Sequence, residues 1–148
     1  ENIKTARLDG VKPMLYINYS ATPLAFHDVT KLVLPHKMYG FPFMDLSGNY
    51  GISNRDNYVI HEKSDKELEI IAEFLSTKTA LYVYEATRYR MKYLEKYAFM
   101  FLPDVTKIPE LIAERPITDK TIGVYFGFDE EEKKSVERLH NKTYDFAY

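Results

Sequence analysis

The sequence changes character near Ser64, and this change restricts the possible folds more than any other feature. Before Ser64, short runs rich in β-branched and aromatic residues are separated by turn residues, which is typical of strands. After Ser64, apolar residues recur at helical spacing. The connections in the first half are short. We therefore expect an α+β fold, in which a small mixed or antiparallel sheet in the first half is followed by a helical second half.

Strands are predicted at residues 13–19, 31–35, 43–46, 49–53 and 57–61. The Ser47-Gly48 pair lies between two of these runs and predicts a hairpin. A second turn is expected at residues 54–56, and the mixed segment 20–30 is expected to be a loop. Residues 1–11 are expected to be an N-terminal flank outside the domain.

Capping signals mark the second half of the chain. Ser64, with Glu67 three residues later, predicts a capping box at the start of a helix. The apolar residues that follow have helical spacing: Leu68, Ile71, Ala72 and Leu75. A second helix is expected from residue 78 to about residue 93, after a break or a second cap at residues 76–77.

Two further helices are predicted near the C-terminus. Thr118 is expected to cap a short helix that ends at Phe126, with Gly127 in a left-handed conformation after it. Asp129 and Glu132 predict another capping box. We expect one domain over residues 12–140, strand-rich over 12–63 and helical over 64–140, with a tail at 141–148.

Composition excludes several classes of protein. With 45% hydrophobic residues in 148, the chain is not disordered, and it contains no Cys for disulfides, thiolate zinc sites or a cysteine nucleophile. The longest apolar run, residues 97–102, is far shorter than the roughly 20 residues that cross a bilayer. Since the sequence begins with Glu1, we expect a piece of a larger protein or a processed product. The absence of Cys favours the cytoplasm, and the short apolar runs predict a domain outside the membrane.

Motifs for catalysis are weak. The four His have no ligand spacing, and no phosphate-binding glycine loop or nucleophile elbow is present. A small metal-dependent nuclease is one alternative, with Asp45 and the pair Glu62-Lys63 as its catalytic groups. Glu62 and Lys63 are adjacent, however, so on a strand their side chains would point to opposite faces. We therefore predict no catalytic residues and no metal site.

Local charge is more informative than the net charge of -2. Basic residues and tyrosines are interleaved between residues 78 and 97, while acidic residues gather at 62–73 and 129–132. This combination suits phosphate contact with stacking. The alternative is a solvated basic face whose tyrosines pack on the sheet.

Further basic and amide side chains occur at the predicted strand ends and turns. Lys31, Lys37 and Arg55 occupy such positions, with Asn57 nearby. Arginine pairs naturally with guanine and asparagine with adenine in the major groove. These residues are therefore candidates for nucleic-acid contact.

The order of segments resembles the C-terminal target-recognition domain of N6-adenine DNA methyltransferases and fused restriction-modification enzymes, the TaqI-like specificity region. The matching elements are a Lys-containing strand ending at Pro (31–35), an Asp-x-x-Gly turn (45–48), a helix ending in Leu-Ser-Thr-Lys (75–78), the pair Leu102-Pro103 and the closing segment 118–139. The resemblance covers about residues 12–140. Ser76-Thr77 replaces the more usual Asn-Ser, and residues 88–100 are unusually aromatic.

The resemblance implies a DNA-binding domain that gives sequence specificity to a methyltransferase or restriction-modification enzyme. The catalytic Asn-Pro-Pro-Tyr motif is absent, so the catalytic domain would lie upstream in the same polypeptide. This fragment would need no cofactor, and the parent enzyme would use S-adenosylmethionine. The partner would be duplex DNA.

The segment order, the basic residues at strand ends and the basic, tyrosine-rich second helix together suggest roles for particular residues in such a DNA-binding domain. The residues expected to contact phosphates are Lys31, Lys37, Arg88, Arg90 and Lys92. Those expected to approach base edges are Arg55, Asn57 and Tyr39. The main alternative is a protein-interaction or structural module of a larger enzyme, because Tyr-rich surfaces also suit protein interfaces.

Overall fold

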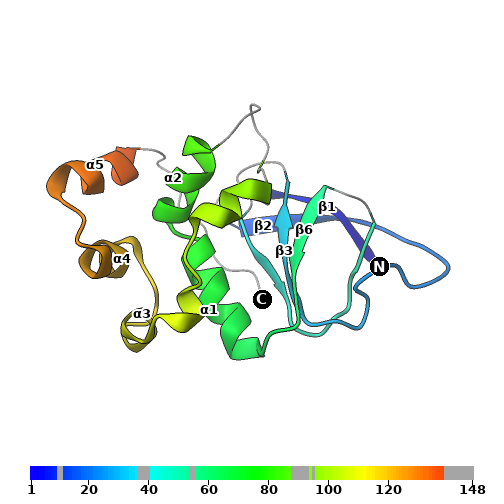
Figure 1. Ribbon diagram of the computed structural model, residues 1–148. Coiled ribbons are helices and arrows are strands. Elements are labelled where there is room, and N and C mark those ends of the chain that lie inside the picture. The colour runs from blue at the N-terminus through cyan, green and yellow to red at the C-terminus, as the bar shows by residue number, and fades with distance from the viewer. Residues whose placement is uncertain (10–11, 37–40, 54–55, 88–93, 95, 139–148) are drawn as a thin grey trace.

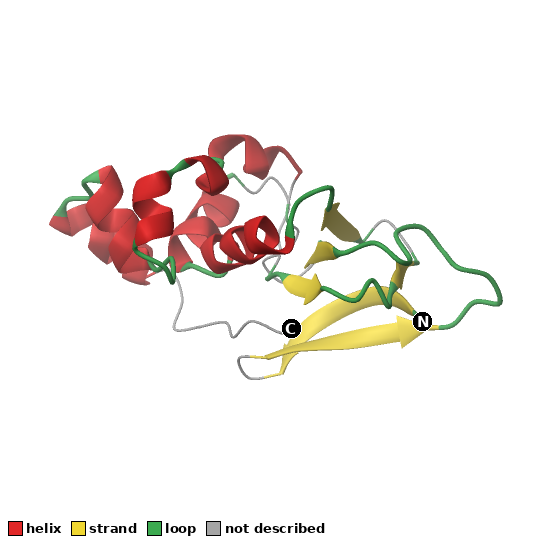
Figure 2. Ribbon diagram, turned by 90° about the horizontal axis from the view of Figure 1, so that it is seen from below, coloured by secondary structure: helices red, strands yellow, loops and turns green. Residues whose placement is uncertain are grey.

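The structure is a computed structural model that describes residues 1–9, 12–36, 41–53, 56–87, 94 and 96–138. It confirms the α+β fold: two small sheets come from the first half of the chain and the helices from the second half (Figure 1). Figure 2 shows the strands at one end of the molecule and the helices at the other. Helix α1 (Asp65–Leu75) contacts β3 and β4, and so joins the two parts.

The first sheet contains β2 (Lys12–Asn18), β1 (Asn2–Asp9) and β5 (Gly51–Ile52), in that order. Strand β1 runs antiparallel to β2 and parallel to β5. The prediction that residues 1–11 lie outside the domain is therefore wrong, because β1 is the central strand. Its pattern was hard to detect because the register shifts between Ile3 and Thr5, which interrupts the alternation of buried and exposed side chains.

The second sheet is antiparallel, with the order β4 (Phe43–Asp45), β3 (Lys31–Pro35) and β6 (Asn57–Ile60). The bounds predicted for β3 are confirmed, and every residue of this strand is buried. Leu68 and Ala72 of α1 pack on Leu32 and Met44 of this sheet. Strand β3 contacts both α1 and β1. Burial of the whole strand explains why Leu32, Val33 and Leu34 form a continuous apolar run rather than an alternating one.

The turn at Ser47-Gly48 is present, but the predicted hairpin is wrong. Gly48 has φ +68°, and β4 pairs with β3 while β5 pairs with β1. The carboxylate of Asp45 accepts hydrogen bonds from the backbone N–H groups of Asn49 and Tyr50, both at 3.1 Å. These bonds fold the chain around Asp45, so it leaves one sheet and enters the other.

The first two predicted helix starts are confirmed. Ser64 Oγ accepts from the N–H of Glu67 at 3.2 Å, and the Glu67 carboxylate accepts from the N–H of Ser64 at 2.8 Å. Thr77 caps α2 (Lys78–Ala86) by accepting from the N–H of Ala80 at 3.2 Å. The predicted continuation of this helix over 88–93 lies outside the described residues.

The helices near the C-terminus are also confirmed. Thr118 caps α4 (Asp119–Phe126), and Gly127 follows with φ +69°. Asp129 and Glu132 exchange hydrogen bonds of 2.8 and 2.9 Å at the start of α5 (Glu130–Arg138). Sequence patterns did not predict three short elements between α2 and α4: η2 (Lys96–Phe101), η3 (Val105–Lys107) and α3 (Pro109–Ala113).

Two carboxylates fasten the helices to one another. Asp119 accepts from the N–H groups of Lys78 and Thr79 and thereby caps α2 from the start of α4. Glu73 of α1 binds the guanidinium of Arg115, and these bonds raise the pKa of Arg115 further above its ordinary value. The helical core that they surround contains Leu34, Ile70, Phe74, Leu75, Ala80, Leu81, Tyr84, Leu94, Ala98, Val105, Leu111, Ile117 and Ile122.

Candidate functional site

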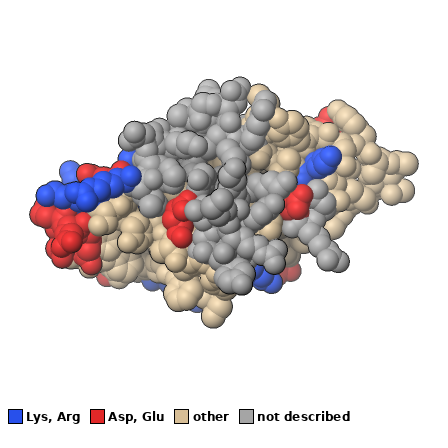
Figure 3. Space-filling model, turned by 90° about the horizontal axis from the view of Figure 1, so that it is seen from above, with Lys and Arg blue, Asp and Glu red and all other residues tan. Residues whose placement is uncertain are grey.

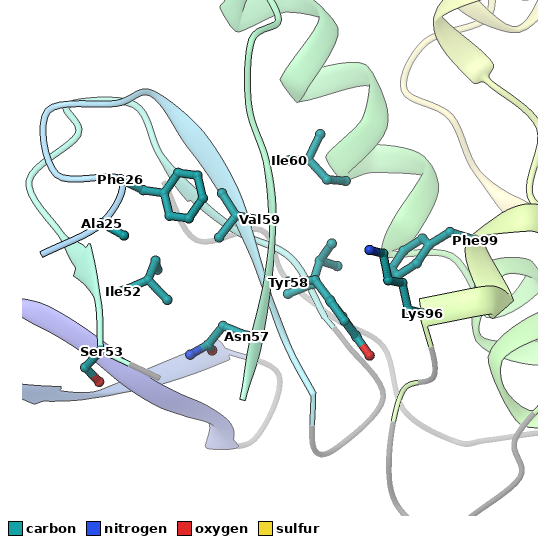
Figure 4. A pocket seen from close by; sticks show the side chains of 11 residues that line it. Ala25, Phe26, Ile52, Ser53, Asn57, Tyr58, Val59, Ile60, Lys96 and Phe99 are labelled. Atoms are coloured by element: carbon teal, nitrogen blue, oxygen red, sulfur yellow. The ribbon is translucent and has the colours of Figure 1, made fainter. Parts of the chain in front are cut away.

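A cavity of about 810 Å³ lies beside β6, and we call it the β6 groove. Its walls come from the loop before β3, from β5 and the residue after it, from β6 and from η2 (Figure 4). The lining residues are Ala25, Phe26, Leu34, Ile52, Ser53, Asn57, Tyr58, Val59, Ile60, Lys96 and Phe99. This volume lies within the range of about 300–1,000 Å³ that is usual for ligand pockets.

Strand β6 divides the groove into two halves, because successive side chains of a strand point to opposite sides. Figure 4 shows Val59 directed toward Phe26 and Ile52, which form the loop half. Tyr58 and Ile60 point the other way and, with Phe99, form the helix half. The rings of Tyr58 and Phe99 meet edge to face with their centroids 5.8 Å apart.

Phe26 is held in the loop half by an unusual backbone conformation. Its φ is +62°, and that of Asp28 is +59°. A bulky residue at positive φ is an outlier that costs on the order of 1–3 kcal/mol and persists only where the surroundings enforce it. Here the Phe26 ring lies 5.1 Å from the ring of His61. The loop thus keeps an aromatic ring at the wall of the groove at an energetic cost.

The turn at Gly48 enforces this loop conformation. The N–H of Asp28 donates to the carbonyl of Gly48 at 2.9 Å. A Cβ atom on Gly48 would lie 2.7 Å from the backbone N of Val29. Only glycine allows this close approach of two backbones at positive φ.

The polar side chains of the groove already bond within the protein. Ser53 donates to the carbonyl of Ile3, Asn57 to that of Lys4 and the Tyr58 hydroxyl to that of Leu94, at 3.0–3.1 Å. Lys96 is exposed and is the one charged residue among the lining residues that the structure describes. Within the described part of the chain it makes no ion pair. The groove therefore offers apolar walls and one cation, which suits binding better than proton transfer.

Lys31 is not available for the predicted phosphate contact. Its side chain has an exposed fraction of 0%, and its ammonium group lies 2.5 Å from Asp45 Oδ2 and 3.0 Å from the carbonyl oxygen of Val29. A lysine is buried to this extent only when it is paired. We therefore remove Lys31 from the candidate phosphate contacts and assign it to the core.

Asp45 has the same structural role, which weakens the nuclease alternative. Its carboxylate binds Lys31 and the two backbone N–H groups of the turn, so its oxygen atoms are occupied. Burial raises the pKa of the neighbouring Tyr50 phenol, and the negative charges of Glu1 and Asp45 add to this effect. Among the residues that the structure describes, no three His, Asp or Glu side chains are placed to share a metal ion.

Asn57 is the one proposed base contact that the structure describes, and it lies in the β6 groove. The other candidate DNA contacts lie outside the described residues: Lys37, Tyr39, Arg55, Arg88, Arg90 and Lys92. Sequence reasoning missed Phe26, Val59 and Lys96 as site residues. The closing position of the strand 57–61 was the available signal, because the last strand of a sheet often forms its edge.

Charged side chains gather at the end of the molecule that carries α5 (Figure 3). Exposed acidic residues Glu130, Glu131 and Glu132 lie beside exposed Lys133 and Lys134 there. On the same face, the end that carries the strands shows few charged side chains. The acidic start of α5 complements the helix dipole, which is sufficient reason for its composition.

None of the helices built from described residues is long and apolar enough to cross a bilayer. Comparison of the chain with family models, with curated proteins and with solved structures finds no match. The similarity to target-recognition domains therefore stays a prediction from the sequence.

Proposed function

We propose that this chain is a protein-interaction module that holds a short segment of a partner polypeptide in the β6 groove. The observation that carries the proposal is the position of this apolar cavity, of about 810 Å³, beside β6, which is an edge strand of the second sheet. Strand edges are common sites of peptide capture, since their backbone groups can bond to another chain.

The chemistry of the lining favours a polypeptide over a small metabolite. Sites for small polar ligands usually present several convergent polar groups. In the β6 groove, the side chains of Ser53, Asn57 and Tyr58 each donate to a backbone carbonyl of the protein. What remains is aromatic and aliphatic surface on two sides, which is the character of a protein-binding surface.

The test fills the groove without disturbing the core. Ala25 is exposed and lines the groove, so Ala25→Trp should block it. Ala113 is an exposed alanine on α3 that is not part of the lining, and Ala113→Trp is the matched control. A phage-displayed library of random dodecapeptides is selected on the wild-type protein, and the tightest peptide is synthesised.

We expect this peptide to bind the wild type and Ala113→Trp equally, and Ala25→Trp at least about tenfold more weakly, as measured by fluorescence anisotropy. A tenfold loss corresponds to about 1.4 kcal/mol. If no peptide is selected, or if Ala25→Trp binds as tightly as the wild type, the groove is not a polypeptide site.

Recognition of duplex DNA for a cytoplasmic methyltransferase or restriction-modification enzyme is the second candidate. The observation that favours it is the interleaving of basic residues and tyrosines between residues 78 and 97. The test is a titration of a fluorescent duplex at several salt concentrations, with Arg88→Glu/Arg90→Glu as the variant. Loss of two phosphate contacts should reduce the slope of log K against log salt by about 1.8.

Lys133→Glu/Lys134→Glu is the matched control for this titration, because it makes the same change of charge on the exposed surface of α5. It should leave DNA affinity unchanged. Absence of binding by the wild type at low salt would reject the DNA candidate.

A further inference from the structure

We infer that the partner segment adds to the second sheet as an extra strand along the outer edge of β6. This inference rests on the proposed polypeptide site and specifies how the segment is bound. It follows from the direction of the backbone groups of β6, the alternation of its side chains and the charge at the groove.

The hydrogen-bond phase of β6 shows which of its backbone groups face outward. The N–H of His36 donates to the carbonyl of Asp56 at 2.7 Å, and Leu34 lies opposite Tyr58 in the same antiparallel ladder. Bonded pairs alternate along such a ladder, so Tyr58 directs its N–H and C=O toward β3 and Val59 directs its own away from β3. Within the described part of the chain, no strand pairs with this outer edge.

The outward N–H and C=O of Val59 are the pair that an added strand requires. One residue of that strand, placed opposite Val59, would exchange two hydrogen bonds with it. The groove lies along this edge, with Phe26 on one side and Phe99 on the other (Figure 4). The cavity is therefore where a neighbouring strand, about 4.8 Å from β6, would be placed.

Side chains of an added strand would alternate between the two halves of the groove. Those on the same face as Val59 would contact Phe26 and Ile52, and those on the other face would contact Ile60 and Phe99. Both halves of the groove are apolar, so the added strand needs no polar side chains on either of its faces. An extended segment with apolar residues on both faces is the occupant that fits, and a helix does not present its backbone to a strand edge.

Lys96 determines the charge of the occupant. It lies at the helix half, and among the described residues of the lining no other is charged. We therefore assign an aspartate or glutamate to the part of the segment that lies nearest Lys96. An exposed ion pair contributes about 0.2–1 kcal/mol, so this contact selects among segments more than it holds them.

The test uses the selected dodecapeptide and a series of its single N-methylated forms. N-methylation removes one backbone N–H and leaves the side chain unchanged. On an added strand, the N–H groups alternate between β6 and solvent. We expect one N-methyl position, opposite Val59, to weaken binding at least about tenfold, or 1.4 kcal/mol, while the two adjacent positions change it less than about twofold.

Charge reversal tests the acidic residue. Lys96→Glu should weaken the peptide about threefold, and replacing the peptide's acidic residue by lysine should restore the affinity. Lys134→Glu on α5 is the matched control and should have no effect, since Lys134 is exposed and is not part of the groove lining. No loss with Lys96→Glu, or no recovery with the lysine peptide, would overturn the assigned charge.

The outcomes separate the two proposals. If Ala25→Trp abolishes peptide binding but all N-methylated forms bind the wild type equally, the polypeptide site stands and strand addition is overturned. A peptide indifferent to Ala25→Trp would overturn both. Sedimentation of the free protein tests whether the occupant is a second copy of this chain. If the wild type is a dimer and Ala25→Trp is a monomer, the groove binds a segment of the same chain and not of another protein.

Discussion

The buried ion pair between Lys31 and Asp45 gives the sharpest prediction from the fold. Lys31→Met keeps a flexible apolar stem of similar length and removes the ammonium group. The exposed fractions of the two side chains are 0% and 3%, so neither charge is compensated by water. We expect this single substitution to destabilise the protein strongly, which a surface lysine that contacts phosphate would not do.

The magnitude follows from what Asp45 retains. In Lys31→Met the carboxylate still accepts from the N–H groups of Asn49 and Tyr50, but it loses the ammonium counter-charge 2.5 Å away. Removing one partner of a buried pair costs about 3–5 kcal/mol. Asp45→Asn leaves a buried lysine and should cost a similar amount. Since the double variant contains neither charge, its loss should be smaller than the sum by about 2–3 kcal/mol.

Urea unfolding followed by circular dichroism measures these free energies, with Lys134→Met as an exposed control that should change stability by less than about 0.5 kcal/mol. If Lys31→Met is unfolded in buffer alone, the series is repeated in trimethylamine oxide, which favours burial. A loss below about 1 kcal/mol for Lys31→Met, or two single losses that simply add, would refute the reasoning.

Three further predictions concern local structure. Gly48→Ala should destabilise the protein by more than about 2 kcal/mol, because the added Cβ would meet the backbone of the 20–30 loop. Gly127 also has a positive φ, but a Cβ there would have nothing within 4 Å, so Gly127→Ala should cost only about 1 kcal/mol. Equal losses in urea unfolding would contradict this prediction. Thr77→Ala should cost about 1–2 kcal/mol, since it removes both the cap of α2 and a bond to the carbonyl of Phe74. Hydrogen bonds from Ser64 lower the pKa of Glu67 below its ordinary value of 4.5. The ionised carboxylate therefore stabilises the fold above pH 4.5, and this stabilisation is lost as the pH falls through the lower pKa of the folded state. The difference in urea midpoint between wild type and Glu67→Gln should therefore be full at pH 6 and shrink as the pH falls below 4.5, and a difference that is constant with pH would contradict it.

The sequence by itself determined the local features of this protein. The change from strands to helices near Ser64, the caps at Ser64, Thr77, Thr118 and Asp129, and the left-handed Gly127 all agree with the structure. Each of these features depends on hydrogen bonds or spacing within a few residues. Such information is present in a short window of sequence, so it can be recognised without knowing the rest of the fold.

Only the tertiary structure decided how distant segments combine. β1 was not recognised, and β4 and β5 were expected to pair with each other, because a strand does not specify its partner through its own residues. Lys31 was expected at the surface, but the fold buries it against Asp45. The β6 groove depends on contacts such as that of Asn57 with Lys4, 53 residues apart. A charge or an apolar side chain acquires its role from what the fold places beside it, and local patterns do not contain that information.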